Sequence, residues 1–145
     1  MKRREVVLGG VTAAALGFAL RAQGADASSP VAAPSPSSGQ KALIDAAFAC
    51  IEVGQACQQH CLNMLSKGDT SLAECATTIA AMLPSCAVLA QLAVQGSPRL
   101  KAMAAVCASI CRDCEQACRK HEKMHAICKQ CADACAACAA QCDKV

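Results

Sequence analysis

Residues 107–142 read CASICRDCEQACRKHEKMHAICKQCADACAACAAQC, and their cysteines recur three or four positions apart. The spacings are four, three and four in the first half of this stretch and three, four, three and four in the second. At 3.6 residues per helical turn, these side chains fall on one face, at positions that bundle helices normally fill with Leu, Ile or Val. The stretch therefore predicts two neighbouring helices whose inward faces carry thiols.

The same periodicity extends upstream through two more segments. The inward stripe of residues 41–67 consists of Leu43, Ala47, Cys50, Gly54, Cys57, Cys61 and Met64. The inward stripe of residues 69–95 consists of Leu72, Cys75, Ile79, Met82, Cys86, Leu89 and Ala93. Thiols are small and bury little apolar area, so a core built from them predicts a gain from sulfur chemistry, with metal binding the leading candidate.

Helix boundaries follow from turn residues. Gly68 and Gly96 are expected just past two helix C-termini. Ser71 with Glu74 fits a capping box, and the Ser-Pro pair at 97–98 fits the N-cap and first position of a third helix.

The third helix should run to about Lys120, and the fourth should begin between His121 and Ala126. Pro84 should kink the second helix, because it removes one backbone donor. Connections this short force antiparallel neighbours. We therefore expect an all-α fold, an antiparallel up-down-up-down four-helix bundle with a cysteine-lined core, over residues 41–145.

The N-terminal residues are typical of an export signal. Residues 1–27 combine a basic start, an apolar run and small residues at their end, and the Arg3-Arg4 pair resembles a twin-arginine signal. Residues 28–40 are rich in Ser, Pro and Ala and predict a disordered linker. We expect an exported, periplasmic or extracytoplasmic protein, with no stable membrane insertion once the signal is removed.

Charge and composition exclude several classes. Beyond residue 27 the chain carries ten basic and nine acidic residues, so it lacks the basic surface that nucleic acids require. Phe48 is its only aromatic residue outside the signal, and no triad, carboxylate pair or phosphate loop indicates an enzyme. Large apolar residues are few, so metal or oligomerisation should add stability.

Three other chemistries could use these cysteines. Disulfides within one helix are disfavoured, because residues three or four apart have Cβ atoms about 5–6 Å apart and a disulfide needs about 3.8 Å; bridges between helices remain open in the metal-free form. Iron–sulfur clusters use closely spaced cysteines on loops, which are absent here. A zinc site needs only four ligands, so fourteen thiols exceed it. A thiol redox or zinc-buffering protein stays the alternative.

Cu(I) fits the pattern best, because it is soft and selects thiolate and thioether ligands. Pairs at i and i+3 or i+4 can approach one ion from the same helix face, and near one Cu(I) per thiolate the core approaches neutrality. The sequence predicts multiple Cu(I) ions held by Cys50, Cys57, Cys61, Cys75, Cys86, Cys107, Cys111, Cys114, Cys118, Cys128, Cys131, Cys135, Cys138 and Cys142.

Because neighbouring helices run antiparallel, the sequence also predicts which residues lie at each end of the bundle. One end should collect soft ligands, and we expect copper to enter there: His60, Met64, Cys75, Cys118, His121, Met124 and Cys128. The opposite end should be closed by Leu43, Leu89, Leu92 and Leu100. His125 and Met103 are expected to be peripheral. We call the first the histidine end and the second the leucine end.

Two motifs resemble the copper storage proteins, a family of cysteine-rich four-helix bundles. They are KALIDAAFAC-x6-C-x3-C at 41–61 and C-x2-C-x3-C-x9-C-x2-C-x3-C-x2-C-x3-C at 111–142. The resemblance covers residues 41–145. It implies inward-facing Cu(I) thiolate sites, a homotetramer, a twin-arginine signal in the exported branch and a role as a copper reserve or detoxification sink. It also implies that His60 and Met64 serve copper entry and release, with other proteins loading or receiving the copper.

Overall fold

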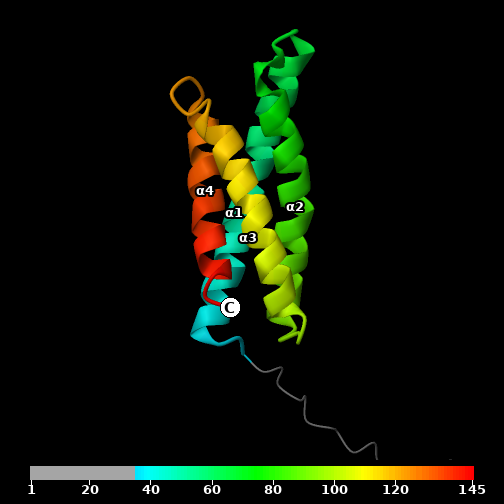
Figure 1. Ribbon diagram of the computed structural model, residues 1–145, viewed down its shortest axis with the longest axis vertical. Helices are drawn as coiled ribbons and strands as arrows, with labels where there is room; N and C mark the ends of the chain where they lie inside the picture. The colour runs from blue at the N-terminus through cyan, green and yellow to red at the C-terminus, as the bar shows by residue number, and fades with distance from the viewer. Residues whose placement is uncertain (1–34) are drawn as a thin grey trace, which may run out of the picture. The chain divides into compact units, whose positions relative to one another are not determined.

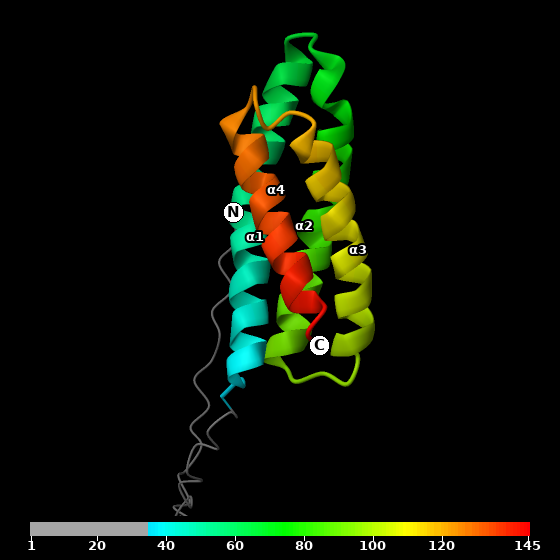
Figure 2. The ribbon, with the colours of Figure 1, turned by 60° about the vertical axis from the view of Figure 1, so that its left-hand side comes forward.

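The computed structural model describes residues 35–145, so the export signal predicted at 1–27 and the first part of the predicted linker lie outside the described residues. Four helices follow one another: α1 (Ser38–Ser66), α2 (Ala73–Val94), α3 (Leu100–Arg119) and α4 (Ala126–Cys142). They run side by side, and the α1–α2 turn extends beyond the α3–α4 turn (Figures 1 and 2). The predicted all-α four-helix bundle is confirmed.

The helices form a ring in chain order. α1 packs on α2 and α4, and α3 packs on α2 and α4, while in the described chain the backbones of diagonally opposite helices do not approach each other. This is the arrangement that short connections between antiparallel neighbours dictate. All four inward faces therefore meet along one central axis.

α1 begins three residues before the predicted boundary. Ser37 is its N-cap: its hydroxyl accepts from the Gln40 backbone N–H, and the Gln40 side chain accepts in turn from the Ser37 N–H. This reciprocal capping box satisfies two backbone donors that a helix start otherwise leaves free. Residues 38–40, assigned to the linker from composition, are thus the first turn of α1.

Both predicted glycine stops are confirmed. Gly68 and Gly96 follow α1 and α2 with φ of 87° and 59°, a left-handed conformation that residues with a side chain rarely adopt. At the first stop, the Asp69 N–H donates to the Met64 carbonyl and closes the helix end.

The start of α2 differs from the expected capping box. Asp69 caps a short 3-10 turn, η1 (Thr70–Leu72), by accepting from the Ser71 N–H. Glu74 is engaged elsewhere, because both of its carboxylate oxygens accept from Lys120 at the end of α3. A contact between helices has therefore replaced the local cap.

α2 is continuous from Ala73 to Val94 and includes Pro84. Together with η1, residues 70–94 are long and apolar enough to cross a membrane by length and composition, and a third of the most apolar window is buried in the bundle. The inward face of α2 supplies Cys75 and Cys86 to the core.

The core consists mainly of thiols. No charged or polar residue is buried among residues 35–145, and all fourteen cysteines are buried. The large side chains that are fully buried are few: Leu43, Leu72, Ile79, Met82 and Leu89. The structure thus confirms the expected thin aliphatic core.

Candidate metal centre

Every helix contributes thiols to the central axis. α1 supplies three cysteines, α2 two, α3 four and α4 five, and none forms a disulfide. Each cysteine occupies the inward stripe that its three- and four-residue spacing predicted. Helical periodicity alone therefore placed all fourteen sulfur atoms correctly on the inner face of the bundle.

The thiols gather into two groups of four and two groups of three. Within each group every Sγ atom lies within 4.8 Å of the others. The upper group, toward the histidine end, contains Cys57, Cys61, Cys75 and Cys128. The lower group contains Cys86, Cys107, Cys111 and Cys138. The groups of three are Cys57, Cys118 and Cys131, and Cys114, Cys131 and Cys135.

Contacts between helices dominate the sulfur network. Cys86 of α2 lies 3.8 and 3.7 Å from Cys107 and Cys111 of α3 and 3.9 Å from Cys138 of α4. The pair Cys107 and Cys111, 3.9 Å apart, belongs to a single helix. Cys107 and Cys111 are one of the predicted pairs within a helix, and neighbouring helices supply the remaining sulfur atoms of their group.

Burial favours the protonated form of thiols in the metal-free core. Burial raises the pKa of Cys61 and of Cys128, because a thiolate loses its hydration there. Hydrogen bonds between thiols shift other pKa values in opposite directions. The contact with Cys107 lowers the pKa of Cys111, and the same contact raises the pKa of Cys107. With no buried cation among the described residues, metal ions are the natural counter-charge for these thiolates.

The histidine end brings His60 and His125 together. His60 Nε2 lies 3.1 Å from His125 Nδ1, and both rings are half-buried. The expectation that His125 is peripheral is wrong, because His125 is the N-cap residue of α4 and is carried back onto α1. Met64 is half-buried near the same end. His60 and Met64 thus lie where an entrance was predicted, and their role as ligands stays a prediction.

Two other residues of the α3–α4 turn differ in environment. The His121 ring centre lies 6.5 Å from that of His125, and its Nδ1 is buried without a hydrogen-bond partner. Met124 is predicted among the soft ligands of the histidine end, but its side chain is 71% exposed. The reason is that α4 begins only at Ala126, so Met124 belongs to a turn and not to a helix face.

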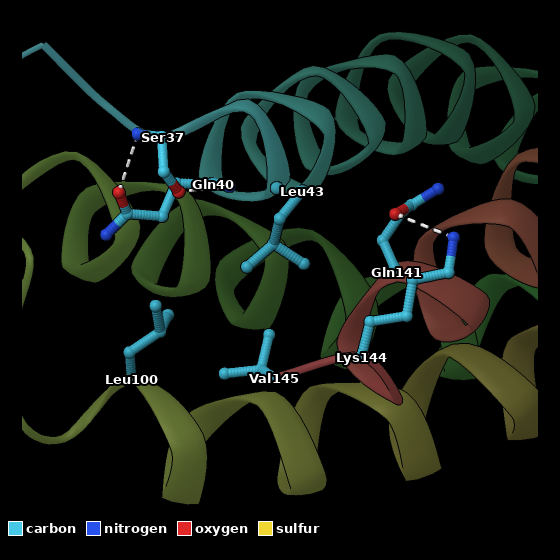
Figure 3. Close-up of a pocket in the computed structure, with 8 residues that line it drawn as sticks. Ser37, Gln40, Leu43, Leu100, Gln141, Lys144 and Val145 are labelled. Carbon is cyan, nitrogen blue, oxygen red and sulfur yellow. Dashed lines mark hydrogen bonds between the residues drawn. The ribbon is translucent and has the colours of Figure 1, made fainter.

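The leucine end is closed below a surface cavity of about 210 Å³. Leu43, Leu100 and Val145 point toward one another on its apolar side, and Gln40, Gln141 and Lys144 line its polar side (Figure 3). Leu43, Leu89 and Leu100 are buried, and Leu92 is half-buried. No cysteine lines this cavity. The described structure thus agrees with aliphatic closure of this end.

Sequence reasoning placed Met82 on an inward stripe but did not treat it as a site residue. Met82 is fully buried, and its Sδ lies 3.4 Å from Cys50 Sγ. Its inward register was the available signal. The sulfur contact itself depends on the relative heights of α1 and α2, which the spacing within one helix does not contain.

The described geometry is a continuous column of soft ligands, closed by leucines at one end and bordered by histidines at the other. Thiolate and thioether sulfur select soft metals such as Cu(I), and groups of four thiolates also satisfy tetrahedral zinc. Cys57 and Cys131 each belong to two groups, so their sulfur atoms are placed to bridge neighbouring ions.

Comparison with known proteins agrees with this geometry. Residues 37–145 match the family model described as copper storage protein. The Cu(I)-bound copper storage protein Csp3 of Bacillus subtilis is 31% identical, with a TM-score of 0.67 over 73% of this chain and 96% of that chain. Its apo form is also 31% identical, with a TM-score of 0.64 over 72% and 96%. No curated protein sequence matches. The chain belongs to the copper storage protein family.

Proposed function

We propose that this protein binds and stores multiple Cu(I) ions as cargo through its inward-facing cysteine thiolates. The observation that carries the proposal is the column of fourteen free, buried thiols in overlapping groups, with no buried cation beside them in residues 35–145. Such a column can hold positive charge along its whole length. Family membership and the Cu(I)-bound Bacillus subtilis relative support copper as the metal.

Storage without catalysis is part of the proposal. A catalytic centre would require positioned acid–base groups or an open coordination site next to a substrate cavity. The described histidines lie at one end of the thiol column, and the surface cavity at the other end is not lined by cysteine. The column itself offers only sulfur ligands in a closed interior.

A thiol redox or zinc-buffering protein is the second candidate. The lower group favours it to a degree, because four sulfur atoms within 4.8 Å of one another suit one tetrahedral Zn²⁺. However, isolated tetrahedral zinc sites in the two groups of four would use eight of the fourteen thiols and leave six without a role. The sharing of Cys57 and Cys131 between groups suits a chain of Cu(I) ions with bridging thiolates, so copper remains the preferred cargo.

Export and assembly complete the proposal. The twin-arginine-like signal in residues 1–27 supports export to the periplasm, where the protein would act as a copper reserve or detoxification sink. The resemblance supports a tetramer. Self-association is also favoured by α2, which carries no charged residue between Glu74 and Arg99 and exposes Val88 and Val94. Proteins that load or receive the copper are expected partners.

Anaerobic titration of the reduced protein with Cu(I) tests the function. We expect about ten or more tightly bound ions, because the overlapping groups offer that many adjacent sulfur pairs. The melting temperature should rise steadily with copper content, since a bound ion stabilises the folded state by mass action. A Cys107→Ala/Cys111→Ala variant should lose capacity, and the exposed Ser109→Ala control should not. Saturation at one to three ions, or preference for Zn²⁺ over Cu(I), would reject the store.

A further inference from the structure

In the middle of the bundle the cysteine stripes of α1 and α2 are both interrupted. On α2, Met82 lies on the inward stripe between Cys75 of the upper group and Cys86 of the lower group. On α1, Gly54 occupies the corresponding position between Cys50 and Cys57. The two residues contact each other at this interruption.

The sulfur of Met82 faces the thiols. Its Sδ lies 3.4 Å from Cys50 Sγ, and Cys50 donates its S–H hydrogen to it. Cys50 Sγ lies 3.6 Å from Cys135 Sγ on α4. Three sulfur atoms bound at about 2.3 Å around one ion would lie roughly 4 Å apart. The separations of 3.4 and 3.6 Å from Cys50 Sγ are shorter than this by about half an ångström, so the sulfur atoms would move apart by that much to admit an ion.

Gly54 holds this orientation. A Cβ atom at position 54 would lie 2.5 Å from Met82 Cε, closer than real Cβ atoms come. The missing side chain therefore makes the space that the Met82 methyl group fills, and the sulfur one bond earlier is left beside the thiols. Ile79 and Leu89, on the same stripe, fill core volume without any sulfur. A filler role explains the burial of Met82, but it does not require the sulfur to face Cys50.

A thioether ligand gives a copper site a different net charge from a second cysteine, because the thioether is neutral and the thiolate is not. A Cu(I) ion bound by one thiolate and one thioether is neutral, whereas two thiolates leave a net negative charge. Residues 35–145 bury no cation that could offset such a charge, and an uncompensated charge in a protein interior is costly. A mixed site at the middle of the column therefore holds an ion without leaving a net charge in the interior.

We propose that Met82 is a copper ligand: Met82 Sδ and the Cys50 thiolate form a thioether–thiolate Cu(I) site between the upper and lower thiol groups, with the Cys135 thiol beside it still protonated. In the metal-free protein a proton on Cys50 bridges the two sulfur atoms. Cu(I) takes its place, and the proton leaves to solvent. The inference rests on the proposed function, namely that the thiol column binds Cu(I).

Selenium absorption spectroscopy tests this assignment directly. In a full-length variant carrying Met64→Leu, Met103→Leu and Met124→Leu, residue 82 is the single selenomethionine after position 1. After loading with Cu(I), we expect its selenium to show a copper neighbour at bonding distance. Copper content is measured on the same sample. Full copper content with only carbon neighbours at selenium would overturn the Met82 site and leave copper storage intact, whereas little bound copper would reject the proposed function.

A capacity measurement provides the second readout. Met82→Leu keeps the side-chain volume and should fold, because exchanges of Leu and Met in a core are well tolerated. We expect it to bind one Cu(I) fewer than the parent protein. Met103→Leu, at a half-buried methionine on α3, is the matched control and should keep full capacity. Unchanged capacity in Met82→Leu would also overturn the proposal.

Discussion

The Sγ atoms of Cys75 on α2 and Cys118 on α3 lie 2.8 Å apart, the shortest of the thiol–thiol contacts in the described chain. Cys75 belongs to the upper group of four, and Cys118 belongs to a neighbouring group of three that shares Cys57 with it. The contact therefore joins two groups across a helix interface. An ion bound in one group has sulfur ligands of the next group within reach.

Proximity makes this pair the first to oxidise. When the reduced, metal-free protein is treated with diamide, which accepts the two electrons and two protons that a disulfide releases, we expect a Cys75–Cys118 bridge before any other. Peptide mapping by mass spectrometry identifies the bridge. Cu(I) loading should prevent it, and Cys118→Ala should abolish it. A first bridge between Cys107 and Cys111 would show that contact distance does not govern oxidation here.

Protonated thiols predict a stability limit at high pH. Burial raises the pKa of Cys61 and Cys128 above the ordinary value of about 9. Their contribution is therefore complete below pH 9 and is lost as the pH rises, since the unfolded chain ionises first. Each thiol should cost up to about 1.4 kcal/mol per pH unit above that point.

Urea unfolding of the reduced, metal-free protein at pH 7, 9 and 10 measures this loss. Replacing both residues (Cys61→Ala/Cys128→Ala) should flatten the decline between pH 9 and 10, while Ser109→Ala should leave it unchanged. Stability that is constant to pH 10 would contradict protonated thiols in the core. Cu(I) uptake at pH 7 should release protons for the same reason, and a pH indicator in weak buffer would detect them.

The contact between Gly54 and Met82 predicts a penalty for filling the glycine. Gly54→Ala gains about 1 kcal/mol of helix propensity, but its Cβ meets the Met82 methyl group, and overpacking a core costs about 1–3 kcal/mol. We expect net destabilisation of roughly 1 kcal/mol. At the exposed Gly39 an added methyl group would meet no other side chain, so Gly39→Ala is the matched control and should be tolerated.

A double-mutant cycle tests whether the destabilisation by Gly54→Ala comes from its contact with Met82. Leucine at position 82 lacks the terminal methyl group, so the free-energy changes of Gly54→Ala and Met82→Leu, measured by urea unfolding, should combine to less than their sum. Strict additivity would mean that the two side chains relax independently.

The sequence correctly predicted the features that depend on a single helix, namely which residues face inward. The stripe of Cys50, Gly54 and Cys57 faces inward as expected, because the 3.6-residue period fixes the face of each residue. The heights of the helices relative to one another are set by packing and turn geometry. The thiol groups, the contact between Met82 and Cys50, and the start of α4 after Met124 depend on those heights, so spacing alone could not supply them.

Transfer of copper should pass through the histidine end. His60 and His125 meet there at 3.1 Å, Met64 lies half-buried beyond them, and leucines close the other end of the column. Replacing the two predicted entry residues (His60→Ala/Met64→Ala) removes ligands that can pass an ion from solvent to the first thiols. We therefore expect slower Cu(I) transfer to a strong chelator in stopped-flow measurements, by several-fold, with total capacity nearly unchanged because the thiols remain. Gln141→Ala, in the cavity at the leucine end, is the control and should not alter the rate. Equal rates for the parent protein and the double variant, or a slower rate for Gln141→Ala, would place the entrance elsewhere without affecting the copper store.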